Sequence, residues 1–278
     1  MTQRAVLCHR CRRLIGSDES ICPWCGATRP ASRWRAKAWP AGTLDGDWIV
    51  TAVITASIVF YLLSLLVSSH RNLTLHPFRF LAPDQNSLLV LGATGTVPID
   101  RFGRIWTLIS ANYLHGGILH ILFNLMALRQ IAPWVNHEYG ASRMFAIYTL
   151  GGVCGYLVSY AAGIPFTIGA SGAVCSLIGS LLYFGKSRGG AYGATVFREV
   201  SGWVVSLVLF GFMVPGINNW AHGGGIVGGV LCGMLLGYNE RRPETAGHRY
   251  LALACAAATV GVLGWAAYAA LLLRYGAA

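Results

Sequence analysis

Residues 221–237 read AHGGGIVGGVLCGMLLG, an apolar stretch in which glycine recurs at every fourth position from Gly225 onward. Residues four apart lie on one face of an α-helix, so these glycines would form a single stripe. A stripe of small residues lets the backbone of a second helix approach closely, which is a common way for helices to pack inside a membrane. His222 lies three residues before Gly225, on the same face. We therefore expect its imidazole to point at whichever helix packs there. The stripe comprises Gly225, Gly229, Gly233 and Gly237.

The composition of the whole chain indicates an all-α polytopic membrane protein. Its 278 residues are 55% hydrophobic and 11% charged, whereas an ordinary soluble domain carries about 25% charged residues. A membrane-crossing helix needs about 20 predominantly apolar residues. By that measure we predict seven spanning helices, over residues 48–67, 116–135, 141–162, 170–184, 202–215, 221–238 and 250–273.

The positive charges predict how these helices are oriented. Most of the 21 Lys and Arg residues fall in the N-terminal arm or at the span ends that share its side of the membrane. Cytoplasmic segments carry an excess of Lys and Arg. We expect a cytoplasmic N-terminus and a C-terminus on the opposite side, in the plasma (inner) membrane of a prokaryote.

The N-terminal arm carries a separate motif, CHRCRRLIGSDESICPWCG, over residues 8–26. Two C-x2-C pairs supply four thiolates, which suit a tetrahedral Zn²⁺ with no open coordination position. Two disulfides are the alternative, which a reducing cytosol disfavours. We predict a structural zinc ribbon over residues 1–28, followed by a basic linker over 29–47, and a cytoplasmic partner for the ribbon. The zinc ligands would be Cys8, Cys11, Cys22 and Cys25.

Polar side chains inside the predicted spans are few, and such residues are candidates for function. Every Asp and Glu falls outside the spans, which argues against a proton-coupled transporter. Ser171, in IGASGAVCS (residues 168–176), opens a helix face of small residues. If this face packs against the glycine stripe, Ser171 comes within hydrogen-bond reach of His222. A serine beside an imidazole base is an activated nucleophile; the alternative is that these small residues serve helix packing alone.

A third segment adds two hydrogen-bond donors. In HGGILHILFNLMAL (residues 115–128), His120 and Asn124 are four residues apart and share one helix face. Two donors on a buried face suit the oxyanion that develops during acyl transfer. The alternative is that they form hydrogen bonds between helices as structural contacts.

Taken together, the three segments resemble the motifs of the rhomboid intramembrane serine proteases, in the order in which that family has them. The family's G-x-S-G matches residues 169–172, its H-x4-H-x3-N matches residues 115–124, and its A-H-x2-G-x3-G matches residues 221–229. The resemblance implies a six-helix protease core over residues 48–239 and an additional C-terminal transmembrane helix within residues 240–278.

The resemblance also implies roles for individual residues. Ser171 would be the nucleophile and His222 the general base, a dyad without a carboxylate. The oxyanion hole would consist of the backbone N–H of Ser171 with the side chains of His120 and Asn124. Further residues would support the active site: His115, Gly169, Gly172, Gly225 and Gly229.

As a rhomboid protease, the protein would cleave single-pass transmembrane substrates in a water-filled cavity, with no cofactor for catalysis and no nucleic-acid partner.

The sequence departs from the family where Thr107 follows Trp106 in place of Arg, and where Cys175 replaces an aromatic residue one turn after the serine. One alternative is a catalytically silent rhomboid-like protein that binds membrane clients. A transporter or receptor with seven spans is the other.

Overall fold

In the computed structural model the chain forms two compact units, and the boundary along the sequence falls between residues 45 and 46. Each unit is described by itself. The structure describes residues 5–8, 14–24, 26, 28, 46–69, 80–214 and 216–275.

The N-terminal unit contains a short antiparallel β-hairpin, in which β1 (Ala5–Leu7) pairs with β2 (Leu14–Gly16). Cys8 directly follows β1. Together with Cys22 and Ile15 it forms a small core, and each of the two cysteines is only 1% exposed. The other two predicted zinc ligands and most of the predicted basic linker lie outside the described residues. Among the residues that are described, no group of three or more His, Cys, Asp or Glu side chains could hold a metal ion.

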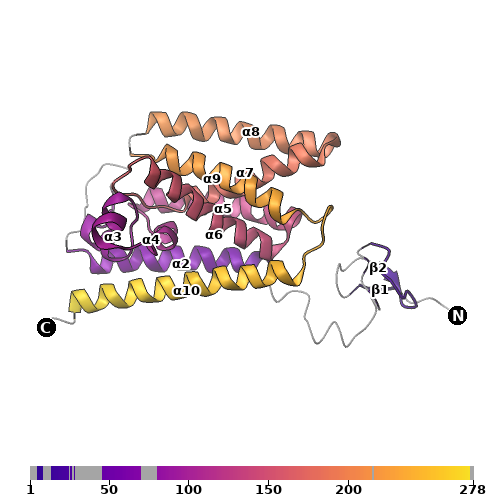
Figure 1. The fold of residues 1–278 in the computed structure, drawn as a ribbon, viewed down its shortest axis with the longest axis horizontal. Coiled ribbons are helices and arrows are strands. Elements are labelled where there is room, and N and C mark those ends of the chain that lie inside the picture. Colours follow the sequence, from indigo (N-terminus) through magenta and orange to yellow (C-terminus); the bar gives the residue numbers. More distant parts are fainter. Residues whose placement is uncertain are drawn as a thin grey trace. The chain divides into compact units, whose positions relative to one another are not determined.

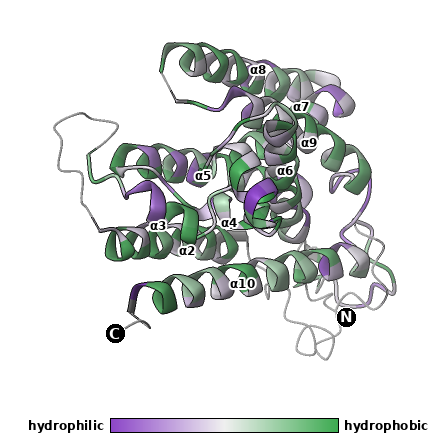
Figure 2. Ribbon diagram, turned by 60° about the vertical axis from the view of Figure 1, so that its left-hand side comes forward, coloured by the Kyte–Doolittle hydropathy of each residue, from purple (hydrophilic) through white to green (hydrophobic). Residues whose placement is uncertain are grey.

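The second unit is a bundle of long helices that run side by side (Figure 1). Hydrophobic residues predominate along these helices (Figure 2). Short helical segments lie between the first and second long helices. In chain order the helices are α2 (Gly46–Val67), α3 (Gln85–Val90), the π-helical turn η1 (Val97–Arg101), α4 (Thr107–Ser110), the 3₁₀ turn η2 (Ala111–Tyr113), α5 (Ile118–Tyr139), α6 (Ala141–Ala161), α7 (Ser171–Arg188), α8 (Gly190–Met213), α9 (Asn219–Leu236) and α10 (Ala246–Tyr275).

Five helices of the described part are long and apolar enough to cross a membrane, namely α2, α5, α6, α8 and α10. The prediction of a mostly helical polytopic membrane protein is therefore confirmed. The other two predicted spans are also helices, α7 and α9, of 18 residues each. They fall outside this set, and polar residues are included in their short length: α7 ends in Lys186 and Arg188, and the first turn of α9 contains Asn219 and His222.

Several predicted helix ends are wrong by four residues or more, and two of them show why. The helix predicted over residues 202–215 begins at Gly190, because its polar first turns are helical as well. Gly189, with φ 68°, separates it from α7. The helix predicted to end near residue 135 continues through Pro133 to Tyr139. In both cases the sequence analysis recognised only the apolar part of a longer helix.

Helix α9 packs against α7 through glycines of the predicted stripe. A Cβ atom on Gly225 would overlap the carbonyl oxygen of Gly172, and one on Gly229 would overlap that of Ser176. The backbones of the two helices are therefore in direct contact. Gly237 does not belong to this face, because it ends α9 with φ 68°.

A second glycine face of α9, which the sequence analysis did not single out, packs against α6. A Cβ atom on Gly224 would lie 2.6 Å from the Cβ of Val158, and one on Gly228 would lie 2.8 Å from the Cβ of Cys154. Helix α9 thus lies close to both α6 and α7. This double contact determines where the first turn of α9 lies.

Candidate active site

Ser171 is the first residue of α7, and a tightly held turn precedes it. Gly169 has φ 125°, a conformation that favours glycine. Its N–H donates to the carbonyl oxygen of Ala111 at 2.9 Å. Its own carbonyl accepts a hydrogen bond of 2.6 Å from the hydroxyl of Tyr156, a buried residue of α6. The backbone that leads into Ser171 is therefore held by two other parts of the bundle.

His222 lies in the first turn of α9, and its Nε2 is 2.8 Å from the Oγ of Ser171. The two residues are 51 positions apart in the chain. The glycine contacts between α7 and α9 bring them together, since Gly172 follows Ser171 and Gly225 follows His222 by one turn. Within the described ranges, the buried Nδ1 of His222 has no hydrogen-bond partner in the protein.

His120 lies beside the same turn. A Cβ atom built on Gly169 would be 2.7 Å from the Nε2 of His120 and 3.8 Å from the Oγ of Ser171. The Nδ1 of His120 accepts a hydrogen bond of 3.2 Å from the N–H of Gly116. A neutral imidazole that accepts at one nitrogen carries its proton on the other. The Nε2–H of His120 is therefore a donor close to Ser171.

Asn124 and His115 flank His120. The amide of Asn124 donates to the carbonyl oxygen of His120, one turn earlier in α5, at 2.8 Å. An amide NH₂ group has two donor hydrogens, so this bond leaves one for another acceptor. The ring of His115 is buried, with its centroid 5.2 Å from that of His120 in a T-shaped arrangement. Both residues thus contact His120, and within the described part of the chain neither has a hydrogen bond to Ser171.

The departures from the family motifs are accommodated by packing. Cys175 is 1% exposed and lies against α9 near Gly225. The hydroxyl of Thr107 bonds to Thr94 at 3.0 Å. Arg104 donates to the carbonyl oxygen of Leu89 at 3.1 Å, so an arginine does fasten this loop, although from a position before Trp106.

Two residues that hold the site were given no role by the sequence analysis, Tyr156 and Asn218. Asn218 is the N-cap of α9, and its side chain accepts from the N–H of Ala221 at 3.1 Å. Asparagine is a preferred N-cap residue, and its place four residues before His222 could have indicated this role. No local pattern indicates the contacts of Tyr156, because its partners come from other segments.

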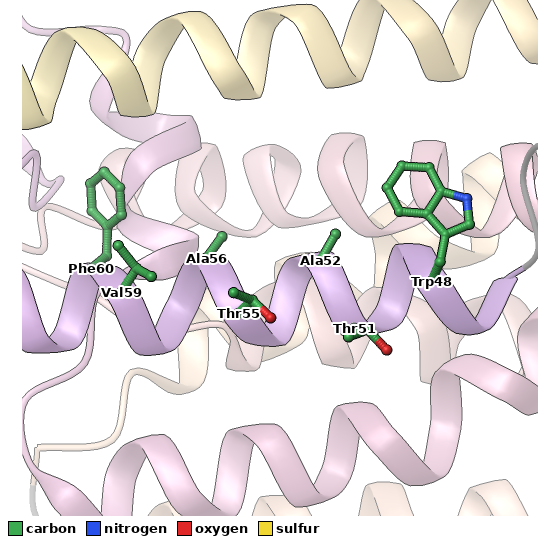
Figure 3. Close-up of a pocket in the computed structure, with 7 residues that line it drawn as sticks. All are labelled: Trp48, Thr51, Ala52, Thr55, Ala56, Val59 and Phe60. Atoms are coloured by element: carbon green, nitrogen blue, oxygen red, sulfur yellow. The ribbon is translucent and has the colours of Figure 1, made fainter.

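A separate groove of about 610 Å³ runs along α2. The aromatic rings of Trp48 and Phe60 stand at its two ends (Figure 3). Small or aliphatic residues lie between them. None of the predicted site residues lines it, so the groove is not part of the candidate active site.

In this helical membrane protein a serine hydroxyl and a histidine imidazole thus lie at hydrogen-bond distance from each other. The family model of the Rhomboid domain matches residues 103–239, which contain both residues and the two predicted oxyanion donors. The chain belongs to the rhomboid family. Members of this family are integral membrane proteins, and its proteases are serine peptidases.

Several proteins with rhomboid names are similar in sequence to this chain. The putative rhomboid protease YdcA of Bacillus subtilis (strain 168) is 31% identical over 143 residues, which are 50% of this chain and 71% of that protein. The rhomboid protease GluP of the same organism is 32% identical over 151 residues, 54% of this chain and 30% of GluP. RHOMBOID-like protein 7 of Arabidopsis thaliana is 28% identical over 228 residues, 76% of this chain and 69% of that protein. The similarity thus spans less than a third of GluP and about two thirds of each of the other two.

Proposed function

We propose that the protein is an intramembrane serine endopeptidase that cleaves transmembrane helices of single-pass substrate proteins with Ser171 and His222 as its catalytic dyad. The observation that carries the proposal is the 2.8 Å distance between Nε2 of His222 and Oγ of Ser171. It lies inside the segment that matches the Rhomboid domain, and two relatives of the chain are named as rhomboid proteases.

In the proposed reaction, His222 takes the proton from the Ser171 hydroxyl as Oγ attacks the scissile carbonyl carbon. The resulting oxyanion would be stabilised by the backbone N–H of Ser171, the Nε2–H of His120 and the amide of Asn124. When the C–N bond breaks, His222 gives its proton to the leaving amine and an acyl-enzyme remains. Water then attacks the ester, with His222 again as the base, and releases the second product.

We also propose that all seven long helices of the second unit cross the bilayer. In this arrangement α7 and α9 are short spans that other helices surround. Buried positions are numerous in α7, which suits a helix enclosed by others. A short span that ends inside the bundle leaves room for water at Ser171, as hydrolysis requires. In this topology α10 is added to a six-helix core, the N-terminus is cytoplasmic and the C-terminus lies across the plasma membrane.

For the N-terminal unit we propose a structural Zn²⁺ held by Cys8, Cys11, Cys22 and Cys25, with no part in catalysis. The donor set suits the ion, because four thiolates form a closed tetrahedral site. Cys8 and Cys22, one from each C-x2-C pair, lie in one buried cluster. The N–H of Gly26 donates to the carbonyl oxygen of Cys22 at 2.9 Å, which closes a turn around the second pair. A cytoplasmic partner would bind this unit.

The experiment that tests the protease proposal is cleavage of a model single-pass substrate by purified wild-type protein and by Ser171→Ala. Cleavage by the wild type and none by the variant is the expected result. Cleavage by both, or by neither, overturns the proposal. A catalytically silent client-binding protein is disfavoured, because both dyad residues are present at bonding distance.

A further inference from the structure

Asn218, the N-cap of α9, contacts α6, the loop between α6 and α7, and the first turn of its own helix. The Nδ2 of Asn218 donates to the hydroxyl of Ser159 at 2.6 Å and to that of Thr167 at 3.0 Å. Its Oδ1 accepts from the N–H of Ala221 at 3.1 Å, which caps the helix. One side chain thus serves as a helix cap and as a bridge to two hydroxyl groups.

The two hydroxyl partners belong to firmly held segments. Ser159 is fully buried in α6, and Thr167 is 7% exposed in the loop between α6 and α7. The backbone of Thr167 pairs with that of Thr94 in both directions, at 3.0 and 2.7 Å. Thr167 lies four residues before Ser171. The segment that carries the serine is therefore fixed at the point where Asn218 contacts it.

The backbone of Asn218 is hydrogen-bonded to that of His222. The N–H of His222 donates to the carbonyl oxygen of Asn218 at 3.2 Å, so the turn that carries the imidazole starts at this residue. The closest glycine contacts of α9 with α7 begin at Gly225, one turn further along. In the first turn itself, the carbonyl oxygen of Ala221 would lie 2.6 Å from a Cβ atom on Gly155 of α6 and 3.5 Å from one on Gly172 of α7. A helix end that is not tied down frays, and the contacts of Asn218 oppose that at the turn that contains His222.

We propose that Asn218 is a positioning residue, whose bridge to Thr167 and Ser159 holds His222 at bonding distance from Ser171. The inference rests on the proposed protease function and deepens it. Asn218 touches no reacting atom. It joins the start of the helix that carries the base to the loop that leads into the nucleophile, and so acts together with the glycine contacts of α9 on the separation of the two groups.

Two substitutions at Asn218 and one at Thr167 separate the bridge from the helix cap. Asn218→Ser keeps a good N-cap but is too short to reach the two hydroxyl groups. Asn218→Asp keeps the cap and can accept hydrogen bonds from both hydroxyls, which reverse their direction. Thr167→Val removes one end of the bridge and leaves Asn218 intact. Asn86→Ser, at an exposed position in α3, is the matched control.

The measurements are kcat and KM for a model transmembrane substrate, the rate constant for labelling of Ser171 by a fluorophosphonate, and the melting temperature. A displacement of about 1 Å can cost about 100-fold in rate. We expect Asn218→Ser to lower kcat and the labelling rate constant by about 10- to 100-fold, with KM and melting close to wild type. Asn218→Asp should restore most of both rates. Because both changes break one bridge, Thr167→Val should add little to the effect of Asn218→Ser.

Wild-type kcat in Asn218→Ser overturns the inference, as does an equal loss in Asn218→Ser and Asn218→Asp. A loss of activity that merely follows a lower melting temperature also overturns it, since Asn218 would then serve folding alone. Failure of the protease proposal gives a different result, because the wild type would then not cleave the substrate, or Ser171→Ala would still cleave it. An inactive Ser171→Ala beside a fully active Asn218→Ser removes only the positioning role.

Discussion

Replacing Gly225 by alanine tests whether contact between α7 and α9 determines catalysis. The new methyl group would overlap the carbonyl oxygen of Gly172, and would lie 3.2 Å from the Cβ of Cys175. The first of these obstacles is backbone, which cannot move aside as a flexible side chain can. Gly172 directly follows Ser171, so any displacement acts on the first turn of α7 and on the nucleophile.

The size of the effect follows from this geometry. To regain ordinary van der Waals contact, the two helices must separate by roughly 1 Å. Overpacking typically costs about 1–3 kcal/mol, and alanine in place of a helical glycine returns about 1 kcal/mol. We therefore expect a net loss of stability of roughly 0–2 kcal/mol. A misplacement of about 1 Å can cost about 100-fold in rate, so kcat should fall much more than stability does.

The assay compares kcat for a model substrate with the melting temperature. Gly261→Ala in α10 is the matched control, because no described atom outside the adjoining backbone of α10 lies within 4 Å of the Cβ that it adds. The control should keep wild-type kcat and gain up to about 1 kcal/mol of stability. A Gly225→Ala protein with wild-type kcat and melting would refute the packing argument, since the two helices could not then be in contact at this glycine.

Three further predictions concern the dyad, the oxyanion donors and the metal. Ser171→Ala and His222→Ala should each abolish cleavage in a folded protein, and the double variant should be no worse, because the two residues act as one unit; cleavage by either single variant contradicts this. His120→Ala or Asn124→Ala should lower kcat by about 10²–10³ while Ser171 still reacts with a small probe, and unchanged kcat in both would leave these side chains a purely structural role. Metal analysis of the wild type should find about one zinc per chain, and its absence would refute the ribbon. Cys8→Ser should lose the zinc and keep cleavage in detergent, because zinc stabilises only the N-terminal unit.

Features that depend on the local periodicity of a helix could be predicted from the sequence. Gly225 and Gly229 are four residues apart, so they had to share a face, and in the structure both contact α7. The apolar stretches predicted the positions of the long helices, because burial in lipid requires about 20 apolar residues wherever the helix lies. The ends of several helices differ from the predicted ones. Polar turns such as those at the start of α8 give no hydropathy signal, although they are as helical as the rest.

Contacts between distant segments were decided by the tertiary structure alone. The sequence named Ser171 and His222, but the 2.8 Å between them results from the packing of α9 against two helices at once. The bridge from Asn218 to Thr167 has no local signature, since it depends on a partner that folding brings near. Gly224 and Gly228 are four residues apart, as Gly225 and Gly229 are, but only the folded bundle decides that they contact α6. From the sequence alone one could predict the helices, the family, and which polar residues inside the spans are candidates for function, because polar side chains are costly in a membrane. How closely those residues approach one another depends on interhelical packing, which arises only when the whole bundle forms.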